Sequence, residues 1–309
     1  MNQDSSGDLA ARPLTVEETV KTFLERRNFF LSLVDRFGSP LYVIEEATLL
    51  ARANGFIAAF RNHLPDVQAY FPIKANSHRR VLETVIKAGM GLEVSSGREL
   101  ELAVTSGARR ILFNGPAKTL EELSLALDYQ EIVTVIMDSA TELERLEMLA
   151  GQRGSKSRTG VRLAVETQGL WRKFGIRFPE LPGFLEKARR CPHIDLKGLH
   201  FHTSWNMEPD AQVQTLIRIS RALSALPPET RQGLEFIDIG GGFWPPQGEW
   251  QVSPPVENLM EDGPADSPGN RSGPYFTLAP AAPIRAFAEQ ICRTIKDHLF
   301  PLQQYQVYT

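Results

Sequence analysis

The stretch YFPIKAN (residues 70–76) places one lysine, Lys74, at the end of an aromatic and apolar run. Helical sequence resumes a few residues later, so the pattern puts Lys74 at the end of a buried strand. A solvated surface lysine is the ordinary explanation for such a residue. The rest of the chain has to decide between that explanation and a chemical role.

Seven further runs resemble this one, and they alternate with helical patterns of about ten to fifteen residues. The eight runs are VQAYFPI (67–73), GLEVSS (91–96), RILFNG (110–115), IVTVIMD (132–138), GVRLAVE (160–166), LKGLHFH (196–202), FIDIGGG (236–242) and YQVYT (305–309). Repeated strand–helix units predict an α/β protein with a parallel sheet, and eight strands match a closed (β/α)8 TIM barrel. An open doubly wound sheet is the alternative, because periodicity alone does not show closure.

Two segments depart from the strand–helix alternation. Residues 1–37 form a polar tail and one amphipathic helix that ends at Gly38, and residues 38–309 contain the barrel. Within the barrel, residues 244–274 are rich in Pro and Gly, so we expect an irregular insertion there, either disordered or a lid.

Composition excludes several classes of protein. The 309 residues carry 34 Lys and Arg against 37 Asp and Glu, a formal charge of −3, which argues against a dedicated nucleic-acid binder. The N-terminus lacks the basic and apolar start of a signal peptide, and no apolar run approaches the roughly 20 residues that span a membrane. Cys191 and Cys292 lie far apart without metal-ligand spacing, as expected of free thiols. A soluble cytoplasmic enzyme is therefore the expected class.

Small and polar residues gather where the predicted strands end. They are Lys74, Ser95, Ser96, Asn114, Asp138, His202, Gly240, Gly241 and Gly242. In a barrel of this kind the functional residues come from the C-terminal ends of the strands. The pattern therefore predicts a site at that end.

Lys74 has two explanations in this setting. A lysine at the mouth of a barrel can lose solvation, which lowers its pKa and frees the amine to attack an aldehyde. Alternatively, it pairs with Glu93 or Glu166 and closes the barrel rim. Sequence spacing does not separate these two.

The glycines and histidines also admit more than one interpretation. Gly240, Gly241 and Gly242 directly follow a strand, so they predict either a phosphate cradle of backbone N–H groups or a tight turn. His200 and His202 alternate along a strand and face one side. Three interpretations are open for this pair. Both rings are hydrogen-bonded polar groups inside the barrel, both are ligands of a metal, or one of them packs on a bound aromatic ring. No other histidine falls at a later strand end, so a metal is the weaker interpretation.

One cofactor accounts for these features together. A Schiff-base lysine, a phosphate cradle and a histidine that covers a ring are what pyridoxal phosphate requires.

The chain resembles the barrel domain of the pyridoxal-phosphate decarboxylases of the alanine-racemase-like fold, the group of diaminopimelate, ornithine and arginine decarboxylases. The matching stretches are GSPLYVIEE (38–46), YFPIKAN, GLEVSSGREL, FNGPAKT, KFGI (173–176), GLHFHTSW and IDIGGGF. The resemblance implies that Lys74 forms a Schiff base with the cofactor and that His202 stacks on its ring. It also implies that Gly240, Gly241 and Gly242 bind its phosphate.

The chain departs from this family in two places. The family has a Gly-Ser pair shortly after the second histidine, whereas here the chain reads Thr203-Ser204-Trp205, which leaves Ser204 as the displaced phosphate-binding serine. The family also has a Glu-Pro-Gly-Arg motif after the eighth strand, where this chain stops, and a C-terminal β-domain that is absent here. The resemblance therefore implies the barrel portion of a longer, homodimeric enzyme.

The implied reaction is decarboxylation of an amino acid, with diaminopimelate or a basic amino acid as substrate. The alternatives are a racemase or epimerase on the same fold, a non-catalytic regulatory homologue, and a metal hydrolase built on His200 and His202. GLEVSSGREL resembles the decarboxylase branch better than the racemase branch.

Overall fold

The computed structural model describes residues 16–165, 173–245, 248–253 and 275–309. Eight parallel strands form one sheet in the order β1-β2-β3-β4-β5-β6-β7-β10. These strands are β1 (Tyr70–Pro72), β2 (Gly91–Val94), β3 (Ile111–Phe113), β4 (Val133–Met137), β5 (Ser157–Arg162), β6 (Ile194–His200), β7 (Phe236–Asp238) and β10 (Gln306–Tyr308). Each lies within or beside one of the eight predicted runs, which confirms the predicted strand count.

The sheet closes on itself between its first and last strands. Gln68 N–H donates to the Val307 carbonyl at 2.9 Å, and Tyr70 N–H donates to that of Thr309 at 2.6 Å. A parallel bridge joins Gln68 and Tyr308 across the same seam. The architecture is therefore a (β/α)8 barrel, and the open doubly wound alternative is wrong.

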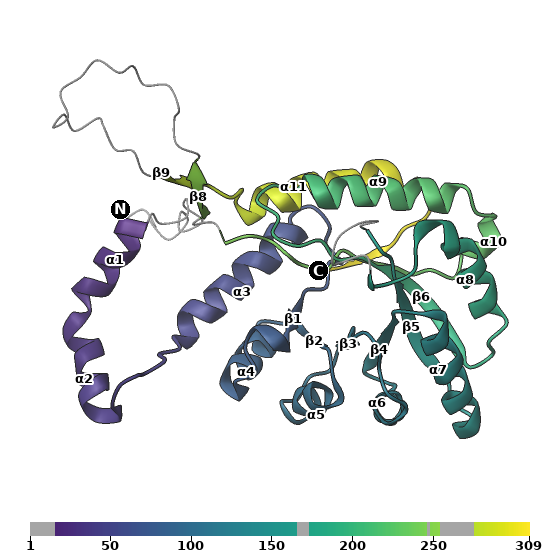
Figure 1. The fold of residues 1–309 in the computed structure, drawn as a ribbon, viewed down its shortest axis with the longest axis horizontal. Coiled ribbons are helices and arrows are strands. Elements are labelled where there is room, and N and C mark those ends of the chain that lie inside the picture. The colour runs from purple at the N-terminus through teal and green to yellow at the C-terminus, as the bar shows by residue number, and fades with distance from the viewer. Residues whose placement is uncertain (1–15, 166–172, 246–247, 254–274) are drawn as a thin grey trace, which may run out of the picture.

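Helices surround the strands on the outside (Figure 1). They are α3 (Glu46–Arg61), α4 (Arg79–Lys87), α5 (Gly97–Thr105), α6 (Leu120–Asp128), α7 (Ala140–Arg153), α8 (Leu181–Arg189), α9 (Asp210–Ser224), α10 (Pro228–Arg231) and α11 (Ile284–Thr294). Shorter helical turns are η1 (Ile73–Ala75), η3 (Phe178–Glu180) and η4 (Ile295–Leu299). The main core lies between the strands and these helices.

Three of the helices begin through one local device. Ser96, Thr119 and Ser139 each precede a helix, and each hydroxyl accepts a hydrogen bond from the backbone N–H of a glutamate three residues later. Such caps satisfy N–H groups that have no partner inside the helix. Ser96 therefore starts α5, which gives this strand-end residue a structural role.

A buried ion pair fixes the loop after β3. Lys118 Nζ lies 3.2 Å from Glu142 Oε2 and donates to the Ile136 carbonyl at 2.7 Å. Burial lowers the pKa of Lys118, and the Glu142 carboxylate opposes that effect. The pair joins the FNGPAKT stretch to α7, so this lysine serves packing rather than the barrel mouth.

A second, smaller core fills the middle of the barrel. We call it the apolar layer; its buried members are Leu112, Ile136, Phe236 and Tyr308, with Tyr70 packed against them. The rings of Phe236 and Tyr308 stack at 4.4 Å between centroids. A Cβ on Gly198 would lie 2.3 Å from the Phe236 ring, so the glycine makes room for the aromatic side chain.

The N-terminal segment differs from the prediction of a single helix. It forms α1 (Val16–Glu25) and α2 (Arg27–Phe37), which meet at Arg26. The Arg26 guanidinium pairs with Glu45 and lies 5.0 Å from the centre of the Phe30 ring, contacts that hold the turn between the helices.

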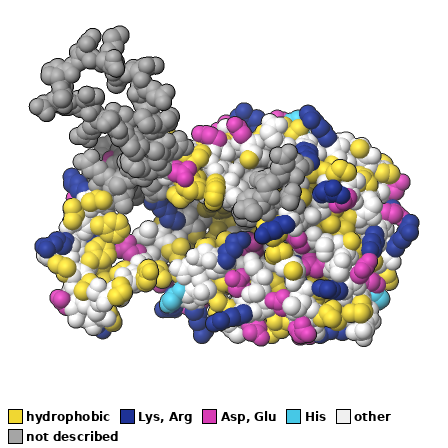
Figure 2. Space-filling model, viewed as in Figure 1, with side chains coloured by type: hydrophobic (Ala, Val, Ile, Leu, Met, Phe, Trp, Pro, Cys, Tyr) yellow, Lys and Arg dark blue, Asp and Glu magenta, His cyan; other side chains and the backbone are white. Residues whose placement is uncertain are grey.

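Apolar side chains stay exposed along this N-terminal segment, as the left of Figure 2 shows. The exposed residues are Val20, Phe23, Leu24, Phe29, Leu31, Val34, Phe37, Leu41, Tyr42, Val43 and Ile44. No residue of α2 is buried. The segment therefore adds little to the barrel core.

The Pro- and Gly-rich insertion is not irregular throughout. Strand β8 (Glu249–Ser253) pairs antiparallel with β9 (Tyr275–Ala279) outside the barrel. The prediction of a loop is therefore wrong at residues 249–253, because a partner strand beyond the insertion supplies their hydrogen bonds. Residues 254–274, on which the prediction of disorder or a lid mainly rested, lie outside the described residues.

Candidate functional site at the barrel mouth

Lys74 lies in η1, directly after β1. Its side chain is 57 % exposed, and its Nζ is 3.6 Å from Glu93 Oε1 on β2. The structure thus contains the pairing with Glu93 that sequence spacing allowed, whereas Glu166 lies outside the described residues. The loss of solvation that the other interpretation required is not seen in this chain, because more than half of the side chain is open to water.

The three glycines form a tight loop after β7. Gly240 and Gly242 have φ angles of 62° and 81°. A Cβ on Gly242 would lie 2.0 Å from the Thr203 carbonyl oxygen, and one on Gly240 would lie 2.5 Å from that of Phe201. Only glycine fits this close approach of two backbones.

The N–H groups of this loop have different partners. Gly240 N–H donates to Asp238 Oδ1 at 2.9 Å, and Gly241 N–H donates to His202 Nδ1 at 3.3 Å. Among the described residues, the Gly242 N–H has no acceptor. It is therefore the donor of this loop that is free for an anion.

His202 is a half-buried ring beside the glycine loop. Burial is the main cause that lowers the pKa of His202 to about 3, and the charges of Lys74 and Arg162 act in the same direction. The ring is therefore neutral at physiological pH. A neutral imidazole can lie on a bound aromatic ring without carrying a charge into it.

Four side chains next to Lys74 and His202 form what we call the polar layer: Glu93, Asn114, His200 and Asp238. Hydrogen bonds join Asn114 to both Glu93 and His200, and His200 to Asp238. Both ring nitrogens of His200 are thus engaged. Within the described ranges no cluster of three or more His, Cys, Asp or Glu side chains could hold a metal ion, so geometry gives the metal-hydrolase alternative no support.

Sequence analysis missed two residues of the mouth, Arg162 and Asp238. The Arg162 side chain is 12 % exposed and its Nη1 lies 4.0 Å from Asp138 Oδ1. Burial lowers the pKa of Arg162, and Asp138 opposes this. Arg162 follows Gly160 by two positions on β5, and Asp238 follows Phe236 by two positions on β7. Side chains two apart on a strand face the same side, so this alternation could have identified both residues.

The segment after His202 lies against the glycine loop. A Cβ on Gly242 would be 3.0 Å from Ser204 Cα, and Asn206 N–H donates to the Gly242 carbonyl at 2.9 Å. Ser204 is therefore next to the free N–H of the loop. Trp205, which follows it, has a φ of 56° and a side chain open to solvent.

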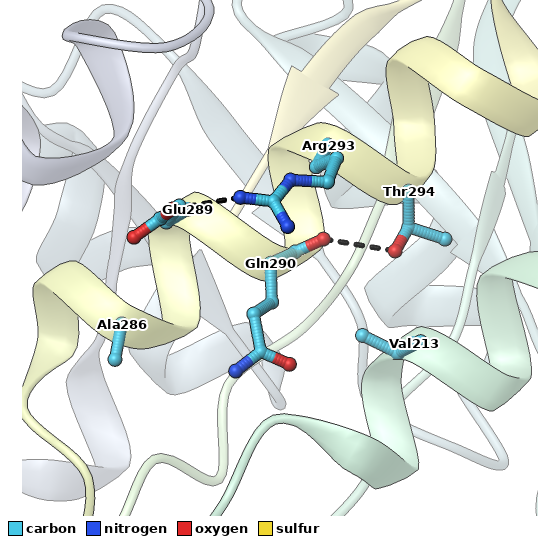
Figure 3. Close-up of a pocket in the computed structure, with 6 residues that line it drawn as sticks. All are labelled: Val213, Ala286, Glu289, Gln290, Arg293 and Thr294. Carbon is cyan, nitrogen blue, oxygen red and sulfur yellow. Dashed lines mark hydrogen bonds and ion pairs between the residues drawn. The ribbon is translucent and has the colours of Figure 1, made fainter.

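Two surface cavities do not contain Lys74, His202 or the glycines. One, of about 260 Å³, lies between α9 and α11 and is lined by Val213, Ala286, Glu289, Gln290, Arg293 and Thr294 (Figure 3). Its charged groups pair with each other, with Arg293 2.7 Å from Glu289. The other, of about 480 Å³, lies between the end of β4 and α8 and includes Asp138, Phe184 and Lys187. Site chemistry points to the mouth rather than to either cavity.

The mouth matches what pyridoxal phosphate needs from a protein. An amine, a neutral imidazole and a free backbone N–H beside a serine all face the same end of the barrel. At Gly240 and Gly242 two backbones approach too closely for any side chain, so this part of the mouth consists of backbone alone. The residues present therefore fit this cofactor.

Comparison with known proteins gives the same answer. The family described as pyridoxal-dependent decarboxylase, pyridoxal binding domain, matches residues 50–260. The chain is 34 % identical over 259 residues to a diaminopimelate decarboxylase from Actinosynnema pretiosum subsp. auranticum, a match that covers 75 % of this chain and 56 % of the relative. It is 27 % identical over 247 residues to one from Aquifex aeolicus, covering 74 % and 57 %.

A solved structure shows the same fold. The diaminopimelate decarboxylase from Helicobacter pylori, complexed with L-lysine, matches with a TM-score of 0.68 and 18 % identity. This match covers 90 % of the chain and 64 % of the solved one. The chain therefore spans little more than half the length of the curated relatives it matches. It belongs to the pyridoxal-dependent decarboxylase family and contains that family's pyridoxal binding domain.

Proposed function

We propose that this chain provides the cofactor-binding barrel of a pyridoxal-phosphate-dependent amino-acid decarboxylase. Residues 38–309 form the barrel domain in this proposal, and residues 1–37 form an N-terminal extension. The observation that carries it is the meeting of Lys74, His202 and the glycine loop at one end of the barrel. These groups follow β1, β6 and β7, which only barrel closure and strand order bring together.

Each residue has a distinct role in the proposal. Lys74 attaches the cofactor through its amine. Until it reacts, the Glu93 carboxylate, 3.6 Å away, balances the positive charge of the Lys74 ammonium group. His202 covers the ring as a neutral group. The Gly242 N–H and Ser204 hold the phosphate, together with Gly240 and Gly241, whose backbone lets the phosphate approach closely. When bound, the cofactor supplies an aldehyde for an amine and a ring that accepts the electron pair left by carbon dioxide.

The substrate is an amino acid in this proposal, and diaminopimelate is the first candidate because both reported relatives are diaminopimelate decarboxylases. A basic amino acid is the second. We further propose a cytoplasmic homodimer: Cys191 and Cys292 are free thiols, and the exposed apolar face of α1 and α2 offers a surface for assembly. Within the described residues, no helix has the length and apolar character needed to cross a membrane.

Cofactor attachment is the first test. Purified protein mixed with pyridoxal phosphate is expected to develop a visible absorbance band that borohydride removes, and peptide mapping should place the reduced adduct on Lys74. Lys74→Ala should lack the band. Lys87→Ala, at an exposed position at the end of α4, is the matched control and should retain it. A normal band in Lys74→Ala would disprove the assignment.

The reaction class is tested on the whole gene product. Released carbon dioxide and the enantiomer of each remaining amino acid are measured with diaminopimelate, lysine, ornithine and arginine. Decarboxylation requires carbon dioxide in at least one reaction. Inversion without carbon dioxide would replace the proposal with a racemase, and cofactor binding without either reaction would favour a regulatory homologue.

A further inference from the structure

A continuous chain of contacts crosses the barrel mouth from Lys74 to the glycine loop. Lys74 Nζ is 3.6 Å from Glu93 Oε1, which accepts a hydrogen bond from Asn114 Nδ2 at 3.2 Å. Asn114 Nδ2 is 3.0 Å from His200 Nε2. His200 Nδ1 is 2.8 Å from Asp238 Oδ2, and the other oxygen of Asp238 accepts from the Gly240 N–H at 2.9 Å.

The chemistry of these groups fixes where the protons lie. A carboxylate accepts hydrogen bonds, so the Asn114 atom beside Glu93 must be the NH₂ group. The same NH₂ donates its second hydrogen to His200 Nε2, which must then carry a lone pair. His200 is therefore protonated at Nδ1, and that N–H donates to Asp238.

His202, two residues further along, has the opposite tautomer. Its Nδ1 accepts the Gly241 N–H at 3.3 Å, so Nδ1 carries no proton. The ring is neutral at physiological pH, which places its proton on Nε2. Adjacent inward positions of one segment thus hold two imidazoles protonated on different nitrogens, each linked to a different glycine of the loop.

The middle of this chain of contacts is well shielded from water. His200 is 1 % exposed and Asp238 is 3 % exposed. Hydrogen bonds at such positions are costly to break, because the group left without a partner remains buried. Removing one partner should therefore disturb the orientation of the next, rather than let water replace it.

We propose that Asn114, His200 and Asp238 are positioning residues that connect the cofactor lysine to the glycine loop. Through Asn114 they hold the Glu93 carboxylate beside Lys74, and through Asp238 they hold the Gly240 N–H at the other end. The amine and the phosphate loop are thereby set at a fixed separation before any cofactor enters. The positioning role rests on the proposed function. The assignment of protons to His200 and His202 does not depend on it.

The first experiment uses cofactor-free protein. Nitrogen-15 NMR of the imidazole groups is expected to show His200 protonated at Nδ1 and His202 protonated at Nε2. Because this measurement needs no cofactor, it stands even if the proposed function fails. A His200 ring protonated at Nε2 would overturn the network.

The second experiment measures the dissociation constant of pyridoxal phosphate and the rate at which its band with Lys74 appears. Asn114→Leu keeps the size of the side chain and removes the link, so affinity should fall about ten- to hundredfold. The attachment rate should fall as well. Thr159→Val, a buried hydroxyl lost from β5 away from the mouth, is the matched control and should leave both values unchanged.

The outcomes separate the two proposals. Failure of the unsubstituted protein to bind the cofactor would end the proposed function, while NMR still decides the proton assignment. Unchanged affinity and rate in a folded Asn114→Leu would overturn the positioning role. If that variant does not fold, His200→Gln, which keeps the contact toward Asn114 and loses the one to Asp238, is measured in its place.

Discussion

The inside of the barrel contains two layers of opposite chemistry built from the same strands. On β3 and β7, Leu112 and Phe236 belong to the apolar layer, and Asn114 and Asp238 follow them two residues later in the polar layer. Side chains two apart on a strand face the same way, so both layers point inward. The apolar layer fills its space by shape, whereas the polar layer is defined by specific hydrogen bonds.

This difference separates stability from function within one set of strands. Filling the apolar layer removes apolar surface from water, a contribution that depends on volume and fit. The polar layer offsets the cost of burying its groups through the hydrogen bonds that join Glu93, Asn114, His200 and Asp238. We therefore expect substitutions in the apolar layer to change stability first and those at the outer edge of the mouth to change binding first.

The largest expected effect is on the apolar layer itself. Phe236→Ala should lower the free energy of unfolding by about 3–5 kcal/mol, because it removes a fully buried ring and leaves a cavity. Urea unfolding measures the change. Phe37→Ala, at a 60 % exposed position of α2, is the matched control and should change stability by less than about 0.5 kcal/mol. Equal losses in the two variants would contradict the comparison.

Adding a single methyl group to the same layer should have the next largest effect. Gly198→Ala should cost about 1–3 kcal/mol, because its Cβ would lie 2.3 Å from the Phe236 ring. Gly183→Ala in α8 has no atom within 4 Å of the new Cβ and should be neutral or slightly stabilising. Thermal unfolding of the pair tests the comparison, and a neutral Gly198→Ala would mean that the layer is loosely packed.

His202 at the barrel mouth should make the stability of the protein depend on pH. The pKa of His202 is about 3 in the folded chain, below the ordinary value of 6.5. Below pH 6.5 the unfolded state gains a proton that the folded state does not bind, so stability falls until the pH nears 3. The slope from this residue is at most about 1.4 kcal/mol per pH unit.

Removing that imidazole should flatten the pH profile. We expect His202→Gln to lose less stability than the unsubstituted protein between about pH 6.5 and 4, measured by urea unfolding across that range. His298→Gln, whose side chain is exposed, should keep the original profile. A profile unchanged by His202→Gln would show that this histidine is not the group that titrates.

The smallest stability effect is expected at Lys74. Its ion pair with Glu93 is more than half open to water on the lysine side, and such pairs contribute about 0–1 kcal/mol. Lys74→Ala should therefore unfold within about 0.5 kcal/mol of the unsubstituted protein while losing cofactor attachment. A large loss of stability would assign Lys74 a structural role. It would contradict the expectation that substitutions at the mouth change binding before stability.

Most of the fold could be predicted because buried parallel strands are continuous apolar runs with polar ends. All eight were visible in this way, and Lys74, His202 and the glycines were found at their ends. The network from Asn114 to His200 was not, because it joins residues 86 positions apart. Only the closed barrel brings β3 within reach of β6 at the mouth.

Two misses have tertiary causes. The break at Arg26 interrupts a pattern that is apolar and helical on both sides, and it depends on a contact with Glu45 that the helical period does not contain. Strand β8 lies in Pro- and Gly-rich sequence, and its pairing with β9 crosses the insertion. In both places a tertiary contact overrides the local pattern.

The seam of the barrel has a consequence for synthesis. It joins Gln68 to Tyr308, at opposite ends of the barrel sequence, through hydrogen bonds made by residues 307–309. A chain leaving the ribosome would have β1 and β7 with unpaired edges until these residues emerge, and exposed strand edges favour association with other chains. The nascent barrel would therefore be most open to association with other chains until β10 is released.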